Sequence, residues 1–223
     1  MAGSGPIIDW SRVFGTLRPE LIERFWEHLL LTVLAVIIGF LISFPLAIWA
    51  HRHRKVYGPI TGVTGLLYTI PSLALLVLLQ QYFGLTTTTA LIVLSSYTLL
   101  ILIRGMVSGL AGVPADAKEA AQGMGYSTGQ MLWRVELPLA LPVIMAGLRI
   151  ATVTTIGLVT VTAFIGKGGL GIFILRGFNQ FDSTQVMIGG LLSLILAVVV
   201  DVLLVFAERA ATPWASRRSR MVV

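Results

Sequence analysis

Residues 114–138 read PADAKEAAQGMGYSTGQMLWRVELP, the longest polar interruption in the body of an otherwise apolar chain. Pro114 suits the first position of a helix, and Gly125 suits the left-handed residue that ends one. Between them, apolar residues follow the i, i+3, i+4, i+7 spacing of one helix face: Ala117, Ala120, Ala121 and Met124.

A second short helix is predicted directly after this one. Ser127 suits the N-cap, and Gln130, three residues further on, completes a capping box. We expect this helix to end before Pro138. The stretch is therefore predicted as two small amphipathic helices hinged at glycine, with an ordinary solvated loop as the alternative. The apolar face of the second helix consists of Met131, Leu132 and Val135.

The composition is that of an integral membrane protein. Of 223 residues, 56% are hydrophobic and only 12% are charged, whereas soluble domains have about a quarter of charged residues. The net charge of +6 does not indicate a nucleic-acid partner, because the basic residues lie in scattered loops. The absence of cysteine excludes disulfides and thiolate metal sites.

Uncharged runs predict an all-α protein with five transmembrane helices, since about 20 apolar residues cross a bilayer. A short interfacial segment, interrupted at Pro19, is expected within an N-terminal part, 1–28, and a basic tail covers 207–223. The transmembrane domain covers 29–206, with its loop at 111–138. The expected spans are 29–50, 59–83, 90–110, 139–165 and 184–206.

The basic residues predict the orientation. Arg52, Arg54 and Lys55 directly follow the first span, and most other Lys and Arg residues fall in segments on that same side. The positive-inside rule places this side in the cytoplasm. The N-terminus is then outside, and the loop at 111–138 and the C-terminus are cytoplasmic.

Hydroxyl side chains at mid-membrane depth are the candidates for a polar path. Pro71 frees a backbone carbonyl, which Thr69 or Ser72 could re-satisfy. This segment is either a simple kink or a bend that lines a path, and we favour the second interpretation. Thr152 and Thr155 could line the same cavity or only hydrogen-bond their own helix.

Charged and glycine-rich features have structural explanations. Arg149 is expected to pair within the membrane, with Asp201 or Glu136. The basic run that begins with His51 is interpreted as a membrane anchor rather than a metal site. Residues 166–171 match G-x-G-x-x-G but follow a membrane helix instead of a strand, so dinucleotide binding is rejected.

The loop resembles the EAA loop of bacterial ABC-importer permeases. This resemblance implies a coupling helix that docks on a cytoplasmic ATPase. Val135 stands where the family pattern has Ile. The residues that carry the resemblance, and that it identifies as ATPase-coupling residues, are Glu119, Ala120, Ala121, Gly125, Val135, Leu137 and Pro138.

Three further segments, 69–74, 135–142 and 164–171, resemble the permeases of osmoprotectant importers, which carry glycine betaine, carnitine, choline or proline. The resemblance implies a type I importer (MetI-like) fold and alternating access between two permease copies, identical or paralogous. It also implies an extracytoplasmic binding protein and an ATPase dimer that holds ATP and Mg²⁺. This chain would then hold no cofactor and catalyse no reaction.

Other functions agree less well with the sequence. Methionine and polar amino-acid permeases share the loop but match segment 69–74 less well. A channel or secondary transporter would need no ATPase. A membrane-embedded enzyme would need a cluster of ionisable residues at membrane depth, where only Arg149 and Asp201 lie.

Overall fold

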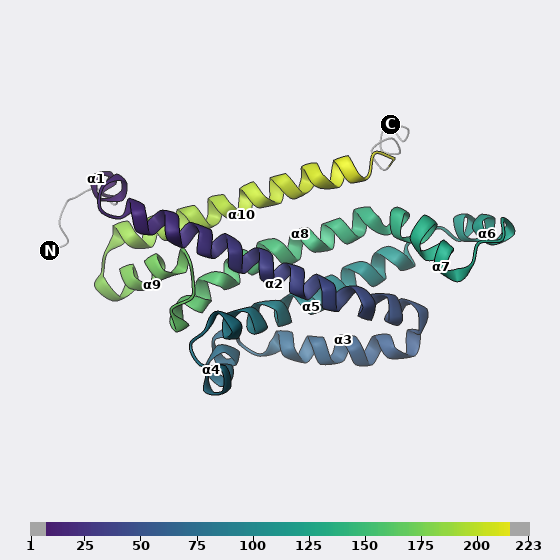
Figure 1. Cartoon of the computed structure of the whole chain (residues 1–223), viewed down its shortest axis with the longest axis horizontal. Helices are drawn as coiled ribbons and strands as arrows, with labels where there is room; N and C mark the ends of the chain where they lie inside the picture. The colour runs from purple at the N-terminus through teal and green to yellow at the C-terminus, as the bar shows by residue number, and fades with distance from the viewer. Residues whose placement is uncertain (1–7, 215–223) are drawn as a thin grey trace.

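A computed structural model describes residues 8–214, and within that range the chain is built of helices (Figure 1). The long helices lie side by side along one axis, with shorter helices at both ends. The helices are α1 (Trp10–Phe14), α2 (Arg18–Arg52), α3 (Arg54–Thr69), α4 (Ser72–Phe83), α5 (Thr87–Ala111), α6 (Ala115–Gly123), α7 (Thr128–Met131), the π-helix η1 (Leu132–Glu136), α8 (Leu137–Val161), the 3-10 helix η2 (Thr162–Ile165), α9 (Gly171–Gln180) and α10 (Ser183–Ala211).

Four helical segments within residues 8–214 are long and apolar enough to cross a membrane: α2, α5, the continuous segment Thr128–Ile165, and α10. Helices α3 and α4 pass the same test only together, and they are bent by 93° at the break between them. Counting this bent pair as one span gives the five that the sequence predicts.

The helix that contains the first expected span, 29–50, begins earlier, at Arg18. The predicted interruption lies just before Pro19: α1 ends at Phe14, and Pro19 occupies the first turn of α2, where its missing N–H costs nothing. The residues before 29 therefore belong to two different helices. Only α1 is a separate short helix, and Arg18 to His28 continue without a break into the span.

The predicted end of a helix before Pro138 is wrong. Helix α7 passes through η1 into α8, and Pro138 occupies the first turn of α8. In the wider π turn, the backbone N–H of Leu137 bonds to the carbonyl of Leu132, so the chain continues past a residue that has no N–H to give.

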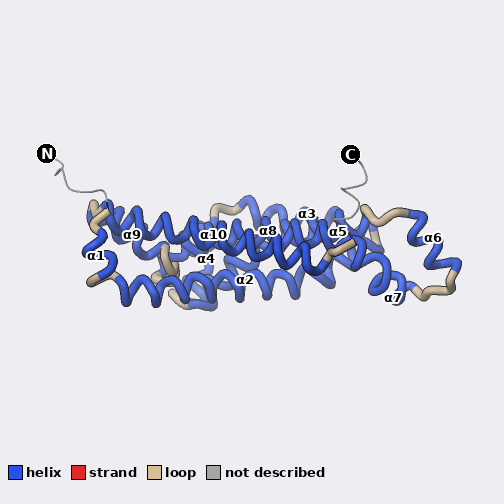
Figure 2. Tube along the Cα trace, turned by 90° about the horizontal axis from the view of Figure 1, so that it is seen from above, coloured by secondary structure: helices blue, strands red, loops and turns tan. Residues whose placement is uncertain are grey.

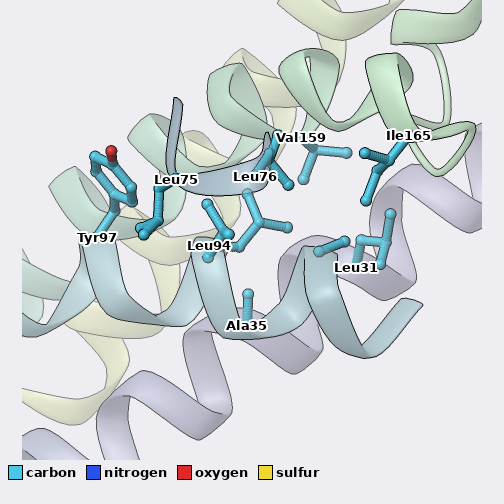
Figure 3. Packing of buried hydrophobic residues seen from close by; sticks show 10 residues of the cluster. Leu31, Ala35, Leu75, Leu76, Leu94, Tyr97, Val159 and Ile165 are labelled. Atoms are coloured by element: carbon cyan, nitrogen blue, oxygen red, sulfur yellow. The ribbon is translucent and has the colours of Figure 1, made fainter. Parts of the chain in front are cut away.

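Helix α5 is the centre of the bundle, in contact with α2 on one side and α8 on the other (Figure 1). Its backbone approaches α8 closely at Gly105: a Cβ added there would lie 3.2 Å from the Cα of Gly147. Such small residues let membrane helices pack through backbone contact. Figure 3 shows side chains from α2, α4, α5 and α8 meeting around Leu94, which is 1% exposed.

Helix α10 faces outward along most of its length. Only 11% of its most apolar 18-residue stretch is buried within the chain, and large side chains such as Leu194 and Phe206 are exposed. On its inner side, Asp201 accepts two hydrogen bonds from Arg149, at 2.9 and 3.0 Å, and Glu208 lies 3.5 Å from the same guanidinium. The expected intramembrane pair of Arg149 and Asp201 is therefore confirmed.

The glycine-rich turn after η2 packs against the backbone and Cβ of the buried His28 in α2. Gly169 has a φ of +50°, and a Cβ added to it would lie 2.5 Å from the Cβ of His28 and 2.7 Å from its Cα. Gly166 has a similar φ of +74°, but a Cβ there would meet open space. The turn thus presses on α2 at one glycine only.

We predict that Gly169→Ala destabilises the protein more than Gly166→Ala. Both changes incur the left-handed penalty of about 1–2 kcal/mol, but only the first also forces α2 away from the turn. Thermal unfolding of the purified protein in detergent measures the difference. Equal unfolding temperatures for the two variants would contradict the contact between the turn and α2.

Candidate functional site

Helices α6 and α7 project beyond the ends of the long helices, at the end of the molecule opposite α1 (Figure 2). The loop at 111–138 is therefore a separate protruding unit with folded structure of its own. Its first helix ends after Gly123, and its second begins at Thr128, so the two predicted amphipathic helices are both present.

The turn between α6 and α7 is specified by Gly125, whose φ of +79° is left-handed. The N–H of Gly125 bonds to the carbonyl of Gln122 at 2.9 Å, and that of Tyr126 bonds to the carbonyl of Ala121 at 3.1 Å. This pair of bonds is the Schellman motif, which favours glycine at the left-handed position. The predicted left-handed residue at Gly125 is confirmed.

The start of α7 is also fixed locally. The backbone N–H of Gln130 donates to the hydroxyl of Ser127 at 3.3 Å, and the Gln130 side chain accepts from the backbone N–H of Ser127 at 2.8 Å. Both halves of the predicted capping box are therefore present. A Schellman turn followed directly by a capping box holds the two short helices at a defined angle.

The faces of α6 differ from the predicted pattern. Ala121 is 1% exposed and packs inward, but Ala120 and Met124 face solvent, with Met124 67% exposed. Glu119 is exposed beside them, and within residues 8–214 no hydrogen bond or ion pair to its side chain is found. The helix is attached by one narrow side, so part of its apolar surface and one carboxylate remain available to a partner.

An ion pair connects α6 to the helix that continues into the membrane. Lys118 Nζ lies 3.1 Å from Oε1 of Glu136 in η1, and His51 Nε2, at the end of α2, lies 3.7 Å from the same oxygen. Sequence reasoning missed both contacts, because they join segments whose spacing carries no pattern. The remaining residues of the loop motif, Val135, Leu137 and Pro138, are half-buried where η1 meets α8.

The bend between α3 and α4 lies where the sequence places it. Ile70 and Pro71 are both extended, with ψ of 128° and 131°. The hydroxyl of Tyr97, on α5, donates to the carbonyl of Ile70. Thr69, one of the two residues expected to re-satisfy backbone groups at the break, donates to the carbonyl of Leu66 at 2.8 Å, as expected. Sequence reasoning missed Tyr97, since a donor on another helix leaves no local signal.

The two threonines of α8 lie inside the fold. Thr152 and Thr155 are 7% and 1% exposed, and their hydroxyls donate to the carbonyls of Leu148 and Ala151 in the same helix, at 2.8 and 2.7 Å. These threonines were expected either to line a cavity or to hydrogen-bond their own helix, and the second is observed. Ser72, by contrast, is half-buried at the start of α4.

The arrangement of these elements defines a class of protein. A bundle of apolar helices carries one protruding two-helix loop, and one of its spans is broken at mid-length. Between Ile8 and Trp214, no group of three His, Asp or Glu side chains is arranged to hold a metal ion. These are the features of a multi-pass membrane protein with a folded loop that extends from one end of its bundle.

The family follows from comparison with known proteins. Residues 35–213 match the family described as "Binding-protein-dependent transport system inner membrane component", and the chain belongs to this family. The choline transport system permease protein OpuBB of Bacillus subtilis (strain 168) is 37% identical over 89% of this chain and 92% of its own. The osmoprotectant import permease protein OsmW of Salmonella typhimurium is 37% identical over 84% of this chain and 90% of its own.

Solved structures show the same fold. An inward-facing form of the MetNI methionine ABC transporter aligns with a TM-score of 0.80 and 24% identity, over 89% of this chain and 99% of that one. An amino acid ABC transporter solved with histidines aligns with a TM-score of 0.71 and 20% identity, over 91% and 99%. The predicted MetI-like permease fold and the resemblance to ABC-importer permeases are confirmed.

We predict that Tyr97→Phe destabilises the protein and that Tyr68→Phe does not. The rings of Tyr68 and Tyr97 lie 5.7 Å apart at the bend, but only the Tyr97 hydroxyl bonds to the freed carbonyl. A buried acceptor left without a partner costs about 1–3 kcal/mol. Thermal unfolding in detergent compares the two variants, and an equal or larger loss in Tyr68→Phe would refute the assignment.

Proposed function

We propose that this chain is the membrane permease subunit of an ATP-driven, binding-protein-dependent importer for a quaternary ammonium or betaine-type osmoprotectant. The observation that carries the proposal is the similarity to relatives named for choline, carnitine and osmoprotectant transport, at 34–37% identity over most of both chains. Membership of the binding-protein-dependent family supports transport rather than catalysis.

The alternatives have less support. The methionine and amino-acid transporters that align in structure do so below 25% identity, so their likeness concerns the fold alone. A channel or secondary transporter would have no use for the protruding loop or for a binding protein. The osmoprotectant assignment therefore takes precedence over the methionine or polar amino-acid alternative.

In this proposal α6 is the helix that docks on the ATPase. Its support is the exposed surface of Glu119, Ala120 and Met124 on a loop that extends beyond the bundle. ATP and Mg²⁺ bind to the partner ATPase, which supplies the free energy, and this chain holds no cofactor. The ion pair of Lys118 with Glu136 then passes motion of α6 into α8.

The solute path in this proposal runs past the bend at Thr69, Pro71 and Ser72. Its support is the rule that irregular backbone at membrane depth lines a cavity or is buried in protein, together with the exposure of Thr69 and Pro71 on the outside of this chain. A second permease copy, identical or paralogous, closes the path from the other side. We leave Thr152 and Thr155 out of it because they are buried within this chain.

The coupling role predicts that Gly125→Ala impairs solute-stimulated ATP hydrolysis and that Gly123→Ala does not. Gly125 needs its φ of +79°, whereas Gly123 is helical and an added Cβ there meets open space. Alanine costs about 1–2 kcal/mol in the left-handed region but favours a helix by about 0.5–1 kcal/mol relative to glycine.

The measurement is ATPase activity of the reconstituted transporter with saturating binding protein and glycine betaine. Membrane insertion, followed by western blot of the membrane fraction, is the control for folding. Stimulated activity in Gly125→Ala equal to that of Gly123→Ala would remove the loop geometry from the mechanism. Stimulation by methionine and not by glycine betaine would refute the substrate class.

The orientation is predicted from charge alone. A phosphatase reporter at Gly3 is expected to be active outside the cell, and a fluorescent reporter after Val223 is expected to fluoresce in the cytoplasm. The helices α3 and α4 then cross the membrane together as one span. Both termini on the same side would mean that the bent pair re-enters and leaves on the side where it began.

A further inference from the structure

A cavity of about 500 Å³ lies beside the attachment of α6, where α2 ends and α3 begins. It is distinct from the bend and from the outward face of α6. Its polar lining comes from four helices. Three of the side chains are basic, His51, Arg54 and Lys118, and two carry hydroxyls, Tyr57 and Ser108. The helices α2, α3 and α5 meet here at the end of the bundle from which the loop projects.

The charges around this cavity are positive in sum. No acidic side chain is among the lining residues, and Glu136, which pairs with Lys118 at 3.1 Å, is the acid that contacts one of them. Arg54 is exposed, and among residues 8–214 no ion pair to its guanidinium is found. An ammonium carries three N–H donors, so Lys118 can keep its bond to Glu136 and donate to a second anion.

The start of α3 adds a second source of positive potential. Helix α3 is 16 residues long, and His53 at its N-cap makes no side-chain hydrogen bond to it. The free N–H groups of a helix N-terminus favour an anion, and phosphate most of all. Arg54, the first residue of this helix, lines the cavity, so the cavity lies at the N-terminal end of α3.

Part of the lining is apolar. Val107 and Ala111, on the last turns of α5, and Ala50, near the end of α2, line the same cavity. A ligand that fits must therefore present an anionic group beside hydrocarbon. Basic pockets between membrane helices on the cytoplasmic side bind anionic lipid head groups in this way.

We propose that this cavity binds the phosphate of an anionic phospholipid, through Arg54, Lys118 and the N-terminus of α3. Because Lys118 belongs to α6 and Arg54 to α3, the bound phosphate joins the loop to the membrane-embedded hairpin. The lipid thereby holds α6 in the position that its ion pair with Glu136 defines. Tyr57 and Ser108 provide hydroxyl donors for the remaining phosphate oxygens.

The test uses the purified transporter in phosphatidylcholine nanodiscs containing a small fraction of spin-labelled phosphatidylglycerol. The immobilised fraction of the label measures binding, and spin-labelled phosphatidylcholine gives the reference. Arg54→Gln should lower the preference for phosphatidylglycerol about fivefold, the usual effect of one basic residue close to an anionic lipid. Lys55→Gln is the matched control, because it removes the same charge from the next residue, which does not line the cavity.

A second measurement reports on α6 directly. Hydrogen exchange of residues 115–123 should be slower in phosphatidylglycerol nanodiscs than in phosphatidylcholine, and Arg54→Gln should abolish that difference while Lys55→Gln preserves it. Neither readout requires transport, so the result is independent of the proposed substrate.

Three outcomes would overturn the proposal. Equal losses of lipid preference in Arg54→Gln and Lys55→Gln would show a general surface effect. Release of the labelled lipid by tens of millimolar inorganic phosphate would show a site for free anions. Exchange in α6 that does not respond to lipid would show that the bound phosphate does not hold the loop.

Discussion

In hydrocarbon, a carbonyl released from a helix has no water to accept from, and this constraint decides where the chain can break. The break before Pro71 is possible because Tyr97 reaches across from α5 to Ile70. The turn after α8 is possible because the hydroxyl of Thr162 lies 2.7 Å from the carbonyl of Val159 and 2.6 Å from that of Lys167. Each irregular segment depends on a donor that the bundle holds in place.

The same constraint explains the central position of α5. It contacts α2 and α8 along their lengths and also carries the donor for the α3–α4 break. Its contact with α8 at Gly105 and Gly147 is made by backbone atoms, so no interlocking side chains resist a change of tilt at that point.

Local chemistry was predictable from the sequence, and long-range chemistry only where two charges stand alone in apolar spans, as for Arg149 and Asp201. The left-handed Gly125, the capping box of Ser127 and the break at Pro71 depend on residues a few positions apart, and all three are present. Tyr97 and the pair of Lys118 with Glu136 could not be found this way, because their partners are distant in sequence. The π turn was missed because proline chemistry alone indicates a stop, and a wider turn removes that stop.

The π turn lies at the point where α6 is attached to the membrane-spanning helix α8. Helix α6 has two attachments, the buried Ala121 and the ion pair to Glu136, and Glu136 is the last residue of η1. Because η1 runs directly into α8, the ion pair attaches α6 to a helix that continues into the bundle with no intervening loop. π turns inside helices occur often at functional sites, and in the proposed function this one lies where the ion pair of α6 meets the start of α8.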